Sequence, residues 1–118
     1  MQRAPLHLAR ARANLLNSIE ALYWAMVDSS HAALIAAKKL PPSPEHIAEL
    51  LEQTFVKERL LDPRYVSWYR EMYELAHEIL HGKITEISAK KVHEWQERAD
   101  LFVREMARLV DKIISKKI

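Results

Sequence analysis

Four stretches of the chain carry apolar residues at helical spacing, and prolines or the single glycine separate them. The first expected helix extends from about residue 5 to residue 39, where Pro41-Pro42 stops it, and Lys38 and Lys39 suit its last turn. Its apolar stripe keeps a helical period and contains Leu8, Leu15, Ile19, Leu22, Met26, Ala33 and Ala37. No segment reads as a strand. The sequence therefore predicts an all-α protein.

The three later helices begin at capping sequences. Ser43-Pro44-Glu45 combines a hydroxyl cap, a proline at the first helical position and an acid in the first turn, and Asp62-Pro63 repeats this chemistry. The third helix should end near His81, with Gly82 as its left-handed terminator, and Ser88 should cap the fourth. The apolar faces of the second and fourth helices are Ile47, Leu50, Leu51 and Phe55, and Val92, Trp95, Ala99, Phe102, Met106, Val110 and Ile113. We expect a single domain over residues 1–118, an antiparallel four-helix up-and-down bundle with one long N-terminal helix.

Composition excludes several kinds of site. The absence of cysteine rules out disulfides, thiolate metal sites and cysteine nucleophiles. A single glycine rules out phosphate loops and dinucleotide fingerprints, which need several. The longest uncharged run, Ser29–Ala37, is too short to cross a bilayer, and no signal peptide opens the chain, so we expect a cytoplasmic protein with no membrane partner. The net charge of +2 does not by itself identify a nucleic-acid-binding protein.

The second half of the first helix is apolar around almost its whole circumference. The apolar residues outside the main stripe are Ala21, Trp24, Ala25, Ala32, Ile35 and Ala36. A helix of this kind is buried on more than one side. Either it lies at the centre of the bundle, or its second face contacts another subunit.

The third helix has two distinct faces. At ~100° per residue, one face is apolar and aromatic and contains Tyr65, Trp68, Tyr69, Met72, Leu75, Ala76, Ile79 and Leu80. A second face carries a strip formed by Arg70, Glu74, His77 and His81, in which consecutive members are neighbours on the helix surface. Histidine transfers protons near neutral pH, and arginine holds a phosphate in a forked geometry. Arg70, His77 and His81 are therefore the candidate catalytic set, with Tyr73 at the margin of the strip.

The strip residues are also compatible with simpler roles. Charged residues at helical spacing on the side away from a core are typical of a solvated helix face. His77 and His81 could chelate a metal with Glu74 nearby, although a third imidazole would have to come from elsewhere. On the first helix, Asp28 and His31 could form an ion pair beside the core, or could line a dimer cleft that faces the strip.

The helix Ala21-Leu22-Tyr23-Trp24-Ala25-Met26-Val27-Asp28, which continues through His31-Ala32-Ala33-Leu34, resembles the signature helix of HEPN domains. The turn Pro41-Pro42-Ser43-Pro44 and the helix that ends in His81-Gly82 add to the likeness, which covers roughly residues 15–105. HEPN domains are small helical bundles, usually dimeric. Many are RNA-cleaving toxins, or partners of minimal nucleotidyltransferases in toxin–antitoxin pairs. The resemblance therefore implies a homodimer that binds a nucleotide or RNA.

The nuclease motif of the HEPN family is an arginine followed, after four to six intervening positions, by a histidine. Arg70 and His77, with six residues between them, fit its loosest spacing. The commonest form would end at His81-Gly82 and would place arginine at position 76, where this chain has Ala76. The resemblance implies metal-independent RNA cleavage, in which a histidine transfers the proton and Arg70 stabilises charge on the phosphate.

Three functions remain open on the sequence. The chain could be an HEPN-like ribonuclease, a non-catalytic HEPN-like module that holds a nucleotide, RNA or a nucleotidyltransferase partner, or a structural dimeric bundle. We expect no cofactor and no metal ion for any of them. In the first two, the residues that line the binding cleft would be Asp28, His31, Tyr73 and Glu74.

Overall fold

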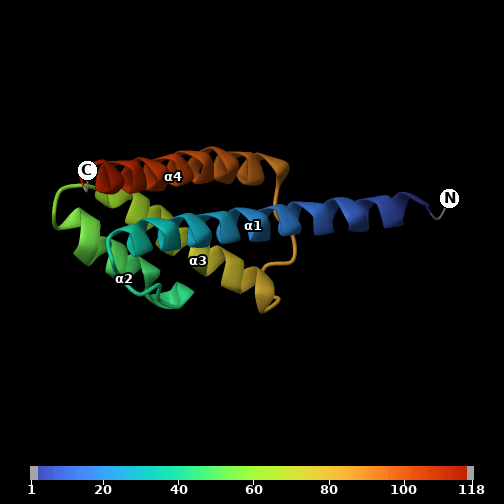
Figure 1. Ribbon diagram of the computed structural model, residues 1–118. Coiled ribbons are helices and arrows are strands. Elements are labelled where there is room, and N and C mark those ends of the chain that lie inside the picture. Colours follow the sequence, from blue (N-terminus) through green and yellow to red (C-terminus); the bar gives the residue numbers. More distant parts are fainter. Residues whose placement is uncertain (1–2, 117–118) are drawn as a thin grey trace.

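The computed structural model describes the backbone of residues 3–116 and the side chains of residues 9–116 (Figure 1). In chain order its elements are helix α1 (Arg3–Ala36), the 3₁₀ turn η1 (Pro44–His46), the short helix α2 (Ile47–Leu51), the π-helical turn η2 (Glu52–Val56), and helices α3 (Pro63–Leu80) and α4 (Ala89–Ser115). No strand occurs in this part of the chain, and the prediction of an all-α fold is confirmed.

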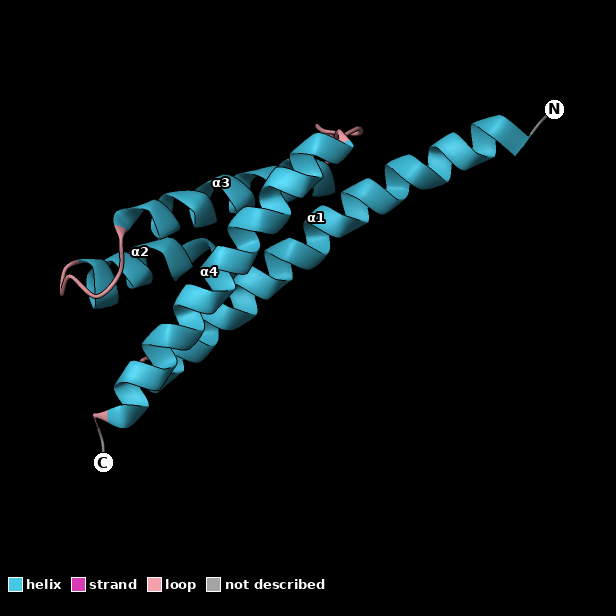
Figure 2. Ribbon diagram, turned by 90° about the horizontal axis from the view of Figure 1, so that it is seen from above, coloured by secondary structure: helices cyan, strands magenta, loops and turns pink. Residues whose placement is uncertain are grey.

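The long helices alternate in direction along the chain. α3 runs opposite to α1 and α4, and α1 packs most extensively against α4 (Figures 1 and 2). After α1 the chain turns back along that helix, where the ring of His31 donates a hydrogen bond from Nε2 to the carbonyl oxygen of Pro42 at 2.8 Å. The molecule measures 64 × 23 × 21 Å because the N-terminal half of α1 projects beyond the other helices.

The core is built from the apolar faces that the periodicity predicts. The buried members of these faces are Ile19, Met26 and Ala33 on α1, Ile47, Leu51 and Phe55 around α2, Tyr69 and Met72 on α3, and Val92, Trp95, Ala99, Phe102 and Met106 on α4. Most other predicted members are half-buried at its edges. The prediction for Leu80 is wrong, because its side chain is 76 % exposed at the end of α3, and Leu8 lies outside the residues whose side chains are described.

α1 is not the central helix of the bundle. It buries one face, while the side chains of Trp24 and Ile35 on the other are 48 % and 55 % exposed. The alanines at positions 21, 25 and 32 are exposed as well. The apolar circumference of α1 therefore does not reflect a central position in the bundle, and a contact with another subunit is the alternative that remains.

Two of the three predicted N-caps are confirmed. The side chains of Asp62 and Ser88 accept hydrogen bonds from backbone N–H groups two and three residues later. The Ser43 hydroxyl instead donates to the carboxylate of Glu45 at 2.9 Å, and only a 3₁₀ turn begins there. A hydroxyl committed to a nearby carboxylate does not cap the backbone, so the helix develops one turn later than predicted.

α1 also ends earlier than predicted, at Ala36 rather than near residue 39. Lys38 adopts a left-handed conformation with φ 64°, and the amides of Lys38 and Lys39 close the helix by bonding back to Ile35 and Leu34. Gly82 ends α3 in the same way with φ 74°, as predicted. The two helices share one type of ending, but α1 places a residue with a Cβ in it.

Substitutions at Gly82 and at Lys38 should change the free energy of unfolding in opposite directions. A Cβ added at Gly82 meets no atom within 4 Å, so Gly82→Ala costs only backbone strain, about 1 kcal/mol of the free energy of unfolding. Lys38→Gly relieves such strain and should raise that free energy by up to about 1 kcal/mol. Urea unfolding followed by circular dichroism measures both. Changes of the same sign would contradict this prediction.

Candidate functional site

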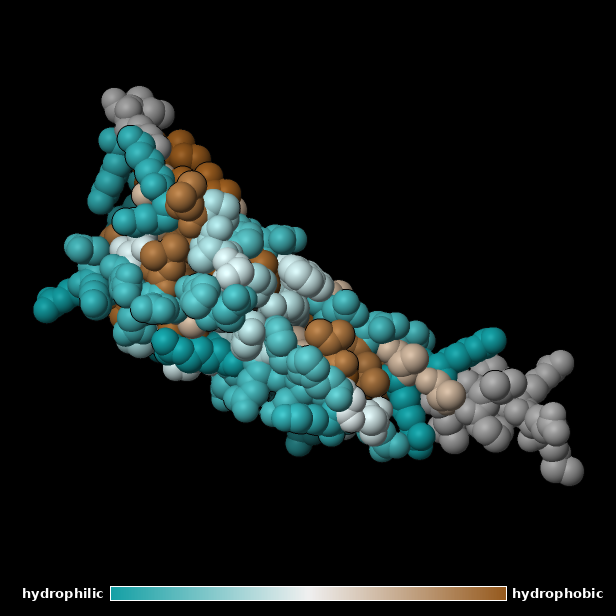
Figure 3. Space-filling model, turned by 90° about the horizontal axis from the view of Figure 1, so that it is seen from below, coloured by the Kyte–Doolittle hydropathy of each residue, from teal (hydrophilic) through white to brown (hydrophobic). Residues whose placement is uncertain are grey.

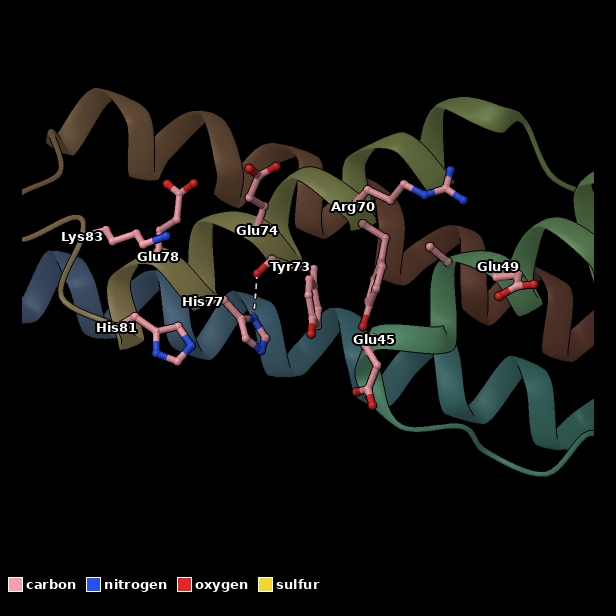
Figure 4. A pocket seen from close by; sticks show the side chains of 11 residues that line it. Glu45, Glu49, Arg70, Tyr73, Glu74, His77, Glu78, His81 and Lys83 are labelled. Carbon is pink, nitrogen blue, oxygen red and sulfur yellow. Dashed lines mark hydrogen bonds between the residues drawn. The ribbon is translucent and has the colours of Figure 1, made fainter.

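One side of α3 borders a groove of about 610 Å³, which we call the α3 groove. The whole predicted strip lines it, together with residues from η1, from α2 and from the segment after α3 (Figure 4). Its polar lining residues are Glu45, Glu49, Tyr69, Arg70, Tyr73, Glu74, His77, Glu78, His81 and Lys83. The helical spacing thus brought the four strip residues and Tyr73 into one groove, although not all of them meet.

A hydrogen bond and two ring contacts hold the His77 side chain in place. Its Nδ1 lies 2.8 Å from the carbonyl oxygen of Tyr73, and its ring stacks on that tyrosine ring at 3.9 Å (Figure 4). The ring of Tyr23 meets it edge-on at 5.9 Å. Because a carbonyl oxygen only accepts hydrogen bonds, Nδ1 carries a hydrogen. In the neutral imidazole, Nε2 is then the atom with a free lone pair, able to accept a proton or a hydrogen bond from a ligand.

His81 and Arg70 lie on either side of this fixed ring. His81 is exposed at the end of α3, and its ring centre is 6.3 Å from that of His77. Arg70 is about 10 Å away from His77 along the helix axis, and its guanidinium points away from both imidazoles (Figure 4). Arg70 and His77 therefore share the groove without converging on one point.

Glu45 enters the groove from a distant part of the sequence. The hydroxyl of Tyr69 donates to the carbonyl oxygen of Pro44 at 2.7 Å and so fixes η1 on α3. Hydrogen bonds from its own backbone amide and from Ser43 lower the pKa of the Glu45 carboxyl, so this group stays ionised. Sequence reasoning assigned Glu45 only to a helix start, and it missed Glu49 and Lys83 as well. The sole local signal was at Glu78, four residues after Glu74 on the same helix face.

The charge of the lining limits what the groove can bind. Four carboxylates face two permanent cations, Arg70 and Lys83, which gives a net charge of −2. The groove therefore does not attract a long polyanion by charge, and an anionic ligand would have to be held by stacking and by individual hydrogen bonds.

A second groove of about 640 Å³ lies between α1 and the end of α3, and we call it the α1–α3 groove. Its walls are mostly apolar and include Leu16, Trp24 and Leu80. Glu45 and His77 line both grooves. The ring that offers Nε2 thus stands at the junction of an acidic and an apolar cavity.

The structure does not join Asp28 and His31 as predicted. The ring of His31 is hydrogen-bonded to Pro42. Asp28 is exposed on the face of α1 opposite its buried apolar stripe. Among residues 9–116, neither lines either groove. His31 and Asp28 do not pair because the loop after α1, placed by tertiary packing, takes the imidazole. That the two residues line a cleft in a dimer stays a prediction.

His77 and His81 also do not form a metal site with Glu74. Within the described residues, no group of three histidine or acidic side chains is placed to hold a metal ion. No helix in that part of the chain is both long and apolar enough to span a bilayer. Comparison with protein-family models, with curated proteins and with solved structures finds no match.

Proposed function

We propose that the chain is a cytoplasmic HEPN-like domain that binds a nucleotide or single-stranded RNA in the α3 groove. The observation that supports this proposal is the fixed imidazole of His77, whose Nε2 faces a groove with a stacking tyrosine, a second histidine and two cations. The HEPN resemblance supplies the setting: a homodimer in a two-gene toxin–antitoxin module, with a minimal nucleotidyltransferase as partner chain.

The lining favours a single nucleotide or an RNA end over a long duplex. Aromatic rings hold bases by stacking, at about 1–3 kcal/mol per base, with little dependence on charge. Tyr73 is already stacked on His77, so a base would stack on the face of the imidazole that Tyr73 leaves open, while the carboxylates of the groove oppose extended phosphate backbones. We therefore expect binding to depend only weakly on salt.

The same residues can perform metal-independent RNA cleavage. Nε2 of His77 removes the proton of a ribose 2′-hydroxyl, and the 2′-oxygen attacks the adjacent phosphorus. The bond to the 5′-oxygen breaks, protonated His81 gives that oxygen a proton, and a 2′,3′-cyclic phosphate remains. Exposed Arg70 must change rotamer toward Tyr73 to contact the phosphate.

His77→Asn tests this proposal. Wild-type protein is titrated calorimetrically with AMP, GMP, CMP and UMP, and is incubated with a labelled structured RNA in EDTA. We expect His77→Asn to weaken nucleotide binding about 10-fold, which is ~1.4 kcal/mol. Cleavage should fall by about 100-fold or more.

His93→Asn is the matched control, because His93 is exposed on α4, pairs with Glu97, and lies outside the groove. If no nucleotide binds at millimolar concentration, or if the His77 and His93 variants behave alike, the nucleotide site is wrong. Binding without cleavage would support the non-catalytic module over the ribonuclease.

A second candidate function, a structural or protein-interaction dimer, is favoured by one observation. α1 exposes an apolar face that nothing in the described chain covers.

A further inference from the structure

α1 carries one continuous exposed stripe along most of its length. At ~100° per residue its members fall within about 60° of a single line. They are Arg10, Ala13, Asn14, Asn17, Ala21, Trp24, Ala25, Asp28, Ala32 and Ile35, and every one of them is exposed. Small or apolar side chains occupy most of the middle of the stripe. Its two charged members, Arg10 and Asp28, have opposite signs and lie eighteen residues apart.

The N-terminal part of this stripe belongs to a segment with little tertiary support. Residues 9–14 are all exposed on the half of α1 that projects beyond the bundle (Figure 2). The ion pair of Arg12 with Glu86, at 3.2 Å, is an exposed contact of this segment and contributes little. An isolated helix of this length is marginal in water, so contacts that cover its face would stabilise it.

The stripe is complementary to itself when two copies run antiparallel. A two-fold axis that crosses the stripe at the level of residue 19, midway between positions 10 and 28, places Arg10 of each copy opposite Asp28 of the other. Between these pairs, Ala13 meets Ala25 and Asn17 meets Ala21, so the two helices can approach closely. The two ion pairs would lie about 27 Å apart, at a rise of ~1.5 Å per residue.

Charge supports this register. Among residues 9–116, neither Arg10 nor Asp28 has an ion-pair partner within its own chain. Apolar side chains reach the surface of the molecule in separate patches (Figure 3), and Trp24 and Ile35 are two of its exposed large apolar residues. The antiparallel register would cover the Trp24 ring with the projecting segment of the other copy.

We propose that two copies of this chain associate through an antiparallel α1–α1 interface closed by reciprocal Arg10–Asp28 ion pairs. Because Asn17 and Trp24 also line the α1–α3 groove, the second copy would form the open wall of that groove. Ten residues a side is fewer than the 20–30 of a standard interface, so we expect a dissociation constant in the micromolar range. The inference rests on the homodimer of the proposed function, whose interface it names, and not on the nucleotide site.

Charge reversal tests the register. Sedimentation velocity of the full chain at tens of micromolar should show the mass rising toward twice 13.8 kDa. Arg10→Asp alone and Asp28→Arg alone should each weaken association at least 10-fold, because each places like charges opposite one another. An equimolar mixture of the two variants should associate again, since both pairs in the mixed dimer then have opposite signs. Arg104→Asp, which breaks the exposed pair with Asp100 on α4, is the control and should change nothing.

Ala21→Glu, which places two carboxylates near the axis, is a second variant, with exposed Ala107→Glu on α4 as its control. A wild-type chain that stays monomeric at every concentration overturns the proposal. So does a dimer that survives both charge reversals, or one that the mixture fails to restore, because another surface then holds it. None of these masses depends on nucleotide, so failure here is distinct from failure of the α3 groove.

Discussion

Phe102→Ala should lower the free energy of unfolding by about 3–5 kcal/mol, as expected for a large aromatic side chain removed from a packed core. Phe102 is completely buried in the middle of α4. The rings of Tyr65 and Tyr69 on α3 each lie 6.3 Å from its ring, so it joins the two helices. Urea unfolding followed by circular dichroism measures the loss.

Leu101→Ala is the matched control on the same helix. Leu101 is 46 % exposed, and its truncation should cost at most about 0.5–1 kcal/mol. If the two variants lose similar free energies, α4 does not face the core as described.

Tyr69 should have the second large effect, and two variants divide it into ring and hydroxyl contributions. Its side chain is 1 % exposed, and its hydroxyl bonds to Pro44. Tyr69→Ala should cost about 3–5 kcal/mol of the free energy of unfolding. Tyr69→Phe removes only the hydroxyl and should cost about 1–2 kcal/mol, because the Pro44 carbonyl loses its donor.

The free energy of unfolding at alkaline pH also depends on the Tyr69 hydroxyl. Burial raises the pKa of Tyr69, so the folded protein keeps the phenol protonated after the unfolded chain has begun to lose that proton, above pH ~10. The unfolded state then binds fewer protons than the folded state, and the stability contributed by Tyr69 is lost as pH rises, by about 1.4 kcal/mol per pH unit. Tyr69→Phe should flatten this decline. An unchanged slope would show that other groups cause it.

Helix positions and the buried faces could be predicted because they depend on local patterns. The stripe of α4 and the caps at Asp62 and Ser88 involve residues within a few positions of one another. The end of α1 could not be predicted in this way. A lysine in the left-handed region is unfavourable locally, and tertiary contacts such as the His31–Pro42 hydrogen bond hold the chain that follows it.

The candidate site, too, could be predicted only where it depends on local spacing along one helix. Helical spacing places Arg70 and His77 on the same side of α3, two turns apart, but it does not determine where a long arginine side chain ends. Glu45, which lies thirty-two residues before His77, enters the groove through a tyrosine–proline contact that no periodicity contains. Glu45 and Glu49, which come from outside α3, supply two of the four carboxylates that make the groove acidic.

The position of His77 in the walls of both grooves has a thermodynamic consequence. A molecule that rotates this ring while occupying one cavity alters the shape of the other. Occupancy of the two cavities is then linked: whatever factor the first ligand imposes on the affinity of the second, the second imposes on the first.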